Sequence, residues 1–349
     1  MKKFTPNYTN IEKSARNIEV ARLPLYEHLI SEKVMEKILN KEFADLRQGT
    51  INDKREFFKN YNGFFQTMGY DTVSFEAWIG AIMPGSGALG RHMPGVISDR
   101  SDFEKYPWAE LPKLFFDAYS DDFRMLEEEM PLGMKAIGGP GCGVFENVQD
   151  IVGYETLCYI SIDDPELYND LFTAVGDAMF KIWKEFLERF GHTFTVCRFG
   201  DDLGFKNATL LPPDDIKFKV IPQYKRIIDL VHACNKPFLL HSCGKIFDVM
   251  EELITVAKID AKHSNEDQIE PFKFWVDTYG DRIGNFGGAD VNVLCEKSEK
   301  EIKDYVKEII TSTRGHGGVA FSSGNSIPAY VPPEGYIAMI EAVRESRGE

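Results

Sequence analysis

Long apolar runs are missing from this sequence. No stretch approaches the roughly 20 consecutive apolar residues that a membrane-spanning helix requires. The first residues, MKKFTPNYTN, are not followed by the apolar segment of a secretory signal. We therefore expect a cytoplasmic protein without a membrane segment.

Positive charge is also in short supply. The 349 residues include 40 Lys and Arg against 55 Asp and Glu, which gives a formal net charge of -15. Duplex nucleic acid and anionic membranes are bound through Lys and Arg, so we expect neither as a partner. Because 43% of the residues are hydrophobic and 13% are aromatic, the chain can build a sizeable core.

Cysteines are few, and two common catalytic motifs are absent. The six cysteines are widely scattered, which argues against a disulfide framework and favours reduced thiols. The loop GGPGCG (138–143) lacks the Lys-Ser or Lys-Thr pair of a phosphate-binding P-loop. The G-x-S-x-G motif of α/β-hydrolases does not occur either. Nucleotide binding and hydrolase chemistry of that type are therefore not expected.

Short apolar runs alternate with longer amphipathic segments along the chain. Eight runs predict strands, at residues 23–30, 72–79, 133–139, 194–200, 237–243, 259–264, 283–290 and 318–324. Eight strands that alternate with helices are typical of a (β/α)8 TIM-type barrel, and a doubly wound open sheet is the competing architecture. We predict a single α/β barrel domain over residues 1–349, with an N-terminal helical extension (1–22) and a loop insertion over the active face (80–110).

Polar side chains collect where the predicted strands end. In parallel barrels these ends form the active face. The candidate site residues are therefore His28, Glu76, Glu146, Asp201, Asp202, His241, Cys243, His263, Asp290 and Asn325. Structural alternatives exist for several of them, since a lone His is often a hydrogen-bonded core residue and Asp201 and Asp202 could cap the following helix.

The stretch KPFLLHSCGKI (236–246) carries the most specific signal. Residues i and i+2 of a strand project to the same side, so His241 and Cys243 can reach a common point where the strand ends. An imidazole nitrogen and a thiolate sulfur are typical zinc ligands. The pair therefore predicts a metal site.

Three stretches resemble the uroporphyrinogen decarboxylase superfamily. They are FGDDLGFKNATLLPPDDIKFKVIPQYKRIIDLVHACNKPFLLHSCGKI (199–246), YGDRIGNFGGADVNVL (279–294) and GGVAFSSGNSIPAYVPPEGYIAMIEAVR (317–344). The resemblance implies a distorted (β/α)8 barrel. True decarboxylases of the superfamily carry an R-Q-A-G-R motif after the first strand, whereas this chain reads LPLYEHLISEKV (23–34) there.

The other branch of the superfamily contains corrinoid-dependent methyltransferases, several of which bind zinc through an H-x-C motif that matches His241 and Cys243. Some of its members add a Cys after the last strand, where this chain has Gly324-Asn325. A third ligand is then expected from a carboxylate. Glu76 and Glu146 are the leading candidates, followed by Asp202.

The resemblance implies a methyltransferase that moves a methyl group between a small methylated substrate (a methoxylated aromatic, a methylamine or a thiol) and a corrinoid, with zinc as Lewis acid. The corrinoid would be carried by a separate protein, because the chain has no D-x-H-x-x-G motif. We expect catalytic roles for His28, Glu76, Asp202 and Asn325, and substrate contacts from Glu146, Asp201, His263 and Asp290.

Other expectations concern the loop insertion and the alternatives. The insertion would form an aromatic lid that includes His92, Tyr106 and Trp108. A tetrapyrrole decarboxylase and a non-catalytic relative are the rival functions, and the protein is a possible homodimer.

Overall fold

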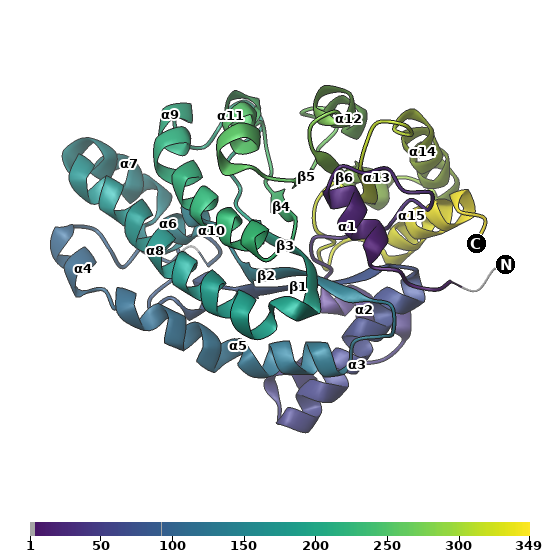
Figure 1. Ribbon diagram of the computed structural model, residues 1–349, viewed down its shortest axis with the longest axis horizontal. Coiled ribbons are helices and arrows are strands. Elements are labelled where there is room, and N and C mark those ends of the chain that lie inside the picture. Colours follow the sequence, from purple (N-terminus) through teal and green to yellow (C-terminus); the bar gives the residue numbers. More distant parts are fainter. Residues whose placement is uncertain (1–3, 92) are drawn as a thin grey trace.

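The computed structural model describes residues 4–91 and 93–349. Its centre is a curled sheet of seven parallel strands, paired in sequence order from β1 to β7, with helices around the outside (Figure 1). The strands are β1 Thr72–Trp78, β2 Lys135–Gly141, β3 Phe194–Gly200, β4 Phe238–His241, β5 Ala261–His263, β6 Gly284–Ala289 and β7 Val319–Ser323. Each lies within or close to one of the predicted runs, so the α/β class with a barrel-like sheet is confirmed.

The helices fill the connections between strands. They are α1 Thr9–Ala15, α2 Glu32–Leu39, α3 Ile51–Met68, α4 Arg100–Lys105, α5 Leu111–Glu128, α6 Val144–Val152, α7 Tyr154–Asp163, α8 Pro165–Phe190, α9 Pro213–Asp215, α10 Ile221–Ala233, α11 Phe247–Glu252, α12 Phe272–Tyr279, α13 Val291–Glu296, α14 Glu299–Ser312 and α15 Pro333–Ser346. Local chemistry sets several of their ends. Thr50 and Asp53 form a capping box that starts α3, and Ser298 and Glu301 do the same for α14.

The predicted first strand, residues 23–30, is not a strand among the described residues. It lies beside β7, where Leu25 and Ile30 form isolated parallel bridges with Phe321 and Ile327. On its other side the Ser74 hydroxyl of β1 lies 2.6 Å from the Glu27 carbonyl oxygen. Pro24 has no N–H to donate to a strand ladder. Toward β1, the Ser74 side chain contacts the segment in place of backbone-to-backbone hydrogen bonds. The segment therefore occupies the position between β7 and β1 without regular strand pairing.

An inner core closes the amino-terminal end of the curled sheet. It contains one inward side chain from each of β2 to β7 together with Tyr26, and the helix α1 adds Ile11 and Ala15: the set is Ile11, Ala15, Tyr26, Ile137, Val196, Leu239, Ala261, Phe286 and Ala320. Because α1 supplies two of these buried residues, it is packed into the molecule as a floor beneath the sheet.

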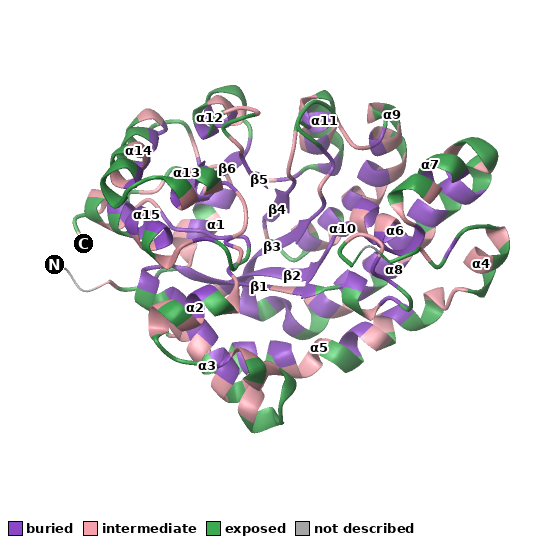
Figure 2. Ribbon diagram, turned by 180° about the vertical axis from the view of Figure 1, so that it is seen from behind, coloured by how far each residue is buried: buried purple, intermediate pink, exposed green. Residues whose placement is uncertain are grey.

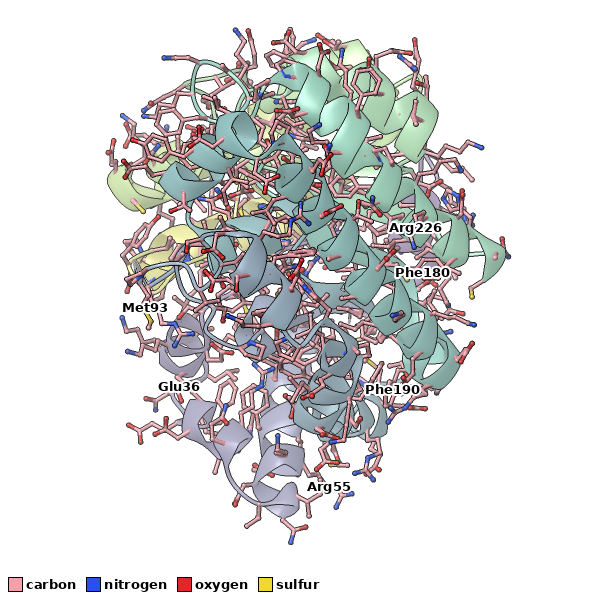
Figure 3. All side chains as sticks on the ribbon, turned by 90° about the vertical axis from the view of Figure 1, so that its left-hand side faces the viewer. Glu36, Arg55, Met93, Phe180, Phe190 and Arg226 are labelled. Carbon is pink, nitrogen blue, oxygen red and sulfur yellow. The ribbon has the colours of Figure 1, made fainter. Side chains whose placement is uncertain are left out.

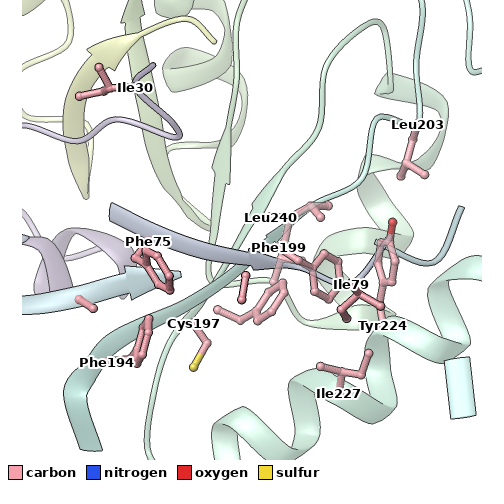
Figure 4. Packing of buried hydrophobic residues seen from close by; sticks show 14 of the residues in the cluster. Ile30, Phe75, Ile79, Phe194, Cys197, Phe199, Leu203, Tyr224, Ile227 and Leu240 are labelled. Atoms are coloured by element: carbon pink, nitrogen blue, oxygen red, sulfur yellow. The ribbon is translucent and has the colours of Figure 1, made fainter. Parts of the chain in front are cut away.

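The larger core lies between the sheet and the outer helices. Figure 2 shows buried residues on the strands and on the inward faces of the helices, with exposed residues outside. Outward side chains of the strands, such as Phe199 and Leu240, pack with Tyr224 and Ile227 of α10 (Figure 4). On the surface, the Arg226 guanidinium of α10 lies 5.0 Å from the centre of the Phe180 ring of α8 (Figure 3).

The segment 80–110 is fastened to α6. Asp150 accepts hydrogen bonds from the backbone N–H groups of Gly87 and Leu89, at 3.0 and 2.9 Å. In the same segment the Tyr106 and Trp108 rings pack 4.6 Å apart, while His92 lies outside the described residues. Among the described residues, no helix is long and apolar enough to cross a membrane.

Candidate metal centre

The inward side chains change from apolar to polar toward the carboxyl ends of the strands. Because inward positions repeat every two residues, Val196 is followed by Arg198, Leu239 by His241 and Ala261 by His263. The register places His241 directly beside His263. A polar layer therefore lies on top of the apolar floor, at the end of the sheet where barrel active sites occur.

His241, Cys243 and Asp202 form a group that can hold a metal ion. Their ligand atoms all lie within 4.8 Å of one another. The Nε2 atom of His241 is 3.5 Å from the Cys243 sulfur and 3.6 Å from Oδ1 of Asp202. The backbone N–H of Cys243 donates to that same Oδ1 at 2.9 Å, which fixes the carboxylate next to the thiol. The predicted His/Cys pair is thus joined by Asp202.

A chain of hydrogen bonds determines which nitrogen of His241 is free. Nε2 of His263 lies 3.0 Å from the carbonyl oxygen of Ser323, and a carbonyl can only accept, so this nitrogen carries the hydrogen. Nδ1 of His263 is then the acceptor for Nδ1–H of His241, 2.7 Å away. Nε2 of His241 is left with a lone pair that faces Cys243 and Asp202. Second-shell bonds of this kind orient metal-binding histidines.

The protonation states also suit a metal site. Burial lowers the pKa of His241 well below its usual value, with further lowering by His263, and burial lowers the pKa of His263 to about 3. Both rings are therefore neutral, as a ligand and its partner must be. Burial and then the Asp202 charge raise the pKa of the Cys243 thiol. A bound cation would reverse that effect and stabilise the thiolate.

Asn325 contacts the thiol from the loop after β7. Its amide nitrogen lies 3.2 Å from the Cys243 sulfur, and its side-chain oxygen accepts from Ser326 N–H at 2.8 Å. The hydroxyl of Ser264 also points at the sulfur, 3.7 Å away. The residue that stands where the methyltransferase branch has a third cysteine thus contacts Cys243 through an amide.

His28 lies against the centre from the 23–30 segment. Its ring stacks on His241 with 3.7 Å between ring centres and a 7° interplanar angle, and His28, His241 and His263 form a second cluster of possible ligands. Nδ1 of His28 is buried and has no hydrogen-bond partner in the described part of the chain. Burial lowers the pKa of His28, so this ring is neutral as well.

Glu76 is held by a buried cation that sequence reasoning did not identify. Arg198 donates from Nε to Oε2 of Glu76 at 3.2 Å, and its Nη1 donates to Tyr26 and Ser74 at 2.9 and 2.7 Å. The sequence did contain a sign of this pair, because Arg198 lies within the apolar run FTVCRFG and a charge in a buried strand must find a partner. Glu76 does not join His241 and Cys243 in the ligand groups of the described residues.

Two glycines of the GGPGCG loop let carboxylates approach the backbone. A Cβ on Gly141 would lie 1.9 Å from Cγ of Glu76, and one on Gly143 would lie 2.2 Å from Asp201. Asp201 accepts from the N–H groups of Phe145 and Glu146 at 2.9 and 2.8 Å. It therefore caps the start of α6.

Glu146 is the most weakly paired acid of the site. Its hydrogen-bond contact is with the Cys142 sulfur at 3.7 Å. Burial raises its pKa, and so do the charges of Asp202, Asp201 and Glu76. Asp290, by contrast, caps α13 through Asn292 N–H at 2.7 Å and accepts from Asp267 N–H at 2.8 Å, and it lines neither part of the cavity at the metal group.

That cavity has two adjoining lobes. The histidine lobe, about 320 Å³, is lined by His28, Leu29, Glu76, Trp78, Leu89, Cys142, Glu146, Gly200, Asp202, His241, Asn325 and Ser326. The lysine lobe, about 380 Å³, is lined by Leu89, Glu146, Gln149, Asp202, Gly204, Phe205, Lys206, Leu210, Cys243, Gly244, Glu266 and Asn325. The two lobes share Leu89, Glu146, Asp202 and Asn325. Because Asp202 belongs to the metal group, this group lies where the lobes meet.

The fold and this site define an α/β protein with a curled parallel sheet and a polar centre at its carboxyl end. The family described as Uroporphyrinogen decarboxylase (URO-D) matches residues 90–346. The chain belongs to this family, which confirms the resemblance seen in the sequence.

Two solved structures are similar over nearly the whole chain. A methyltransferase from Methanosarcina mazei is 14% identical, with a TM-score of 0.72 and with 97% of this chain and 98% of that one covered. A putative vitamin-B12 independent methionine synthase from Listeria monocytogenes is 12% identical, with a TM-score of 0.53 and with 95% and 98% covered. At these identities the likeness concerns the fold. No curated protein matches the sequence.

Proposed function

We propose that the protein is a zinc-dependent methyltransferase that moves a methyl group between a small substrate and a corrinoid carried by a separate protein. One observation carries the proposal: the free Nε2 of His241, the Cys243 sulfur and the Asp202 carboxylate converge beside a cavity. Family membership and the fold shared with a methyltransferase agree with it.

The donor set fits zinc in type and spacing. A tetrahedral zinc ion with ordinary bond lengths separates a coordinating sulfur from a coordinating nitrogen by about 3.6 Å, and the distance between the Cys243 sulfur and His241 Nε2 is 3.5 Å. Three protein ligands leave the fourth position open, which is typical of catalytic zinc. We assign the third ligand to Asp202 rather than to Glu76 or Glu146.

When bound, zinc would act as a Lewis acid that lowers the pKa of a substrate thiol or draws charge from a leaving oxygen. His263 and Ser323 hold the ligand nitrogen in the binding tautomer, and Asn325 donates a hydrogen bond to the ligand sulfur. His28 and Glu146 line the histidine lobe, where they would contact the substrate and transfer a proton. Leu89, from the segment 80–110, helps to cover both lobes.

Tetrapyrrole decarboxylation remains the second candidate because of the family. Its substrate carries several carboxylates, which suit arginine pairs. Among the described residues, however, the histidine lobe is lined by neither Arg nor Lys. That charge pattern favours the methyltransferase.

The test is metal analysis of the purified full chain combined with a methyl-transfer assay. We expect about one zinc per chain, lost in Cys243→Ser and His241→Ala and kept in the control Cys158→Ser, since Cys158 is exposed and lines neither lobe. Methylation of added corrinoid, which is monitored through the absorption spectrum of the corrinoid, should depend on zinc. Methyl transfer that is unchanged after exhaustive chelation would contradict the proposal, and decarboxylation of a tetrapyrrole by the chelated protein would favour the decarboxylase.

A further inference from the structure

The charges around the histidine lobe restrict the ligand. Three carboxylates line it, from Glu76, Glu146 and Asp202, and the described lining contains no lysine or arginine. Arg198 is fully buried and is bonded to Glu76, Tyr26 and Ser74, so it is not available to a ligand. An anionic group that enters this lobe would meet carboxylates and no free cation.

Loading the metal leaves Glu146 as the uncompensated acid. The charges of Cys243 and Asp202 would be offset by a divalent ion, and Arg198 offsets Glu76 at 3.2 Å. Glu146 has only the weak sulfur contact with Cys142. A half-buried carboxylate without a strong donor is costly, and a ligand cation would remove that cost.

Trp78 is an independent sign of a cationic ligand. It lines the same lobe, and it is 40% exposed at the carboxyl end of β1. Indole faces attract ammonium groups, and the attraction grows when the pair is removed from water. The lobe is therefore lined by a carboxylate and an indole together.

Resting on the proposed function, we infer that the substrate is a small thiol, or its thioether, that bears a separate ammonium group. The sulfur would lie at the metal group, since sulfur suits zinc, and the ammonium group would lie between Glu146 and Trp78. The lysine lobe is not an alternative anion site of equal strength, because three acids, Glu146, Asp202 and Glu266, line it together with Lys206.

The experiment compares three thiols of similar size on the cobalt(II)-loaded full chain. They are 2-aminoethanethiol, 2-mercaptoethanol and 2-mercaptoethanesulfonate, and binding is measured by thiolate-to-cobalt charge-transfer absorption. We expect the aminothiol to bind about tenfold more tightly than the neutral thiol and the sulfonate to bind most weakly, as one charge-assisted contact predicts. Glu146→Gln and Trp78→Leu should each reduce the preference, and the surface control Glu155→Gln should not.

Equal or tighter binding of the sulfonate would overturn the inference. If Lys206→Gln abolished the binding of the sulfonate, the charged group of the ligand would lie in the lysine lobe, and this result would also contradict the inference. Failure to bind metal, seen by elemental analysis before any thiol is added, would instead overturn the proposed function. The charge preference of the lobe can still be tested on the metal-free chain, by comparing the binding of propylammonium with that of propionate. Binding is measured as quenching of tryptophan fluorescence, and this quenching should be lost in Trp78→Leu.

Discussion

At the scale of single residues, the centre depends on groups that line neither lobe of the cavity. His263 provides the acceptor that fixes the tautomer of His241, and Ser323 provides the carbonyl that fixes His263. Neither could be ranked above other polar residues from the local sequence. Their importance comes from the register, which sets His241 beside His263.

Removing the tautomer partner should weaken metal binding. We expect His263→Leu to reduce zinc affinity by about 10- to 100-fold, as loss of a second-shell bond does elsewhere, while His263→Asn retains an acceptor and loses less. Competition with a chelator measures the affinity. The control His192→Leu changes an exposed histidine that bonds to Glu127. Equal zinc affinity in His263→Leu and the native chain would show that the tautomer needs no partner.

Glu27 makes the stability of the fold depend on pH. Burial raises its pKa from 4.5 to about 8. Ser323 Oγ lies 2.6 Å both from this carboxyl and from the Asn325 carbonyl oxygen, so a protonated Glu27 can donate to the hydroxyl, whose own hydrogen is then free for the carbonyl. The folded state therefore binds the proton more tightly than the unfolded chain does.

The sign follows from that difference. The stabilisation from protonated Glu27 is complete below about pH 4.5 and is lost as the pH rises toward 8. Glu27→Gln, whose amide can make the same donation, should gain stability relative to the native chain by up to roughly 1.4 kcal/mol per pH unit over this range. Urea unfolding at pH values between about 5 and 8 measures it. Parallel pH profiles for the two proteins would refute the assignment.

At the scale of elements, the strand predictions succeeded where a buried run has turn residues on both sides. The predicted and observed limits of β3 agree at Phe194–Gly200. The helix before β4 is irregular near Pro222, with a π-helical turn at Ile216–Val220 before α10 begins at Ile221. The prediction failed at 23–30, because apolar content does not reveal that Pro24 and Ser74 interrupt the ladder.

The site shows the same division. The spacing of two residues predicted that His241 and Cys243 lie together, and they do, with His241 as the last residue of β4 and Cys243 in the loop that follows. The Asp202 partner instead depends on how β3 lies beside β4, and the pair of Arg198 with Glu76 reaches from β3 past β2 to β1. No single stretch of sequence contains this information.

The start of α3 offers a test of local sequence chemistry. Thr50→Ala removes the side chain that accepts from Asp53 N–H and should lower the free energy of unfolding by about 1 kcal/mol. The control Thr311→Ala removes an exposed hydroxyl that bonds to a carbonyl inside α14, and we expect it to change stability by less than about 0.5 kcal/mol. Denaturant titrations compare the two. If the cap did not stabilise the fold, the two variants would show the same change in the free energy of unfolding.

At the scale of the whole molecule, the first helix belongs to the core. Ile11 is fully buried among side chains from β2 to β7, although the sequence suggested an extension. Ile11→Ala should therefore cost about 2–4 kcal/mol, whereas Ile18→Ala, whose side chain is 50% exposed, should cost less than about 1 kcal/mol. Thermal and urea unfolding measure both. Similar small losses would mean that α1 is peripheral.

The placement of α1 also has a consequence for synthesis on the ribosome. Asn17, just after α1, accepts from Gly318 N–H, a partner 301 residues later. The helix α1 must therefore wait, with its apolar face uncovered, until β7 and the residues just before it have been translated. Contacts of such long sequence separation slow folding and expose intermediates to aggregation, so nascent chains of this protein should rely on chaperones more than their modest size suggests.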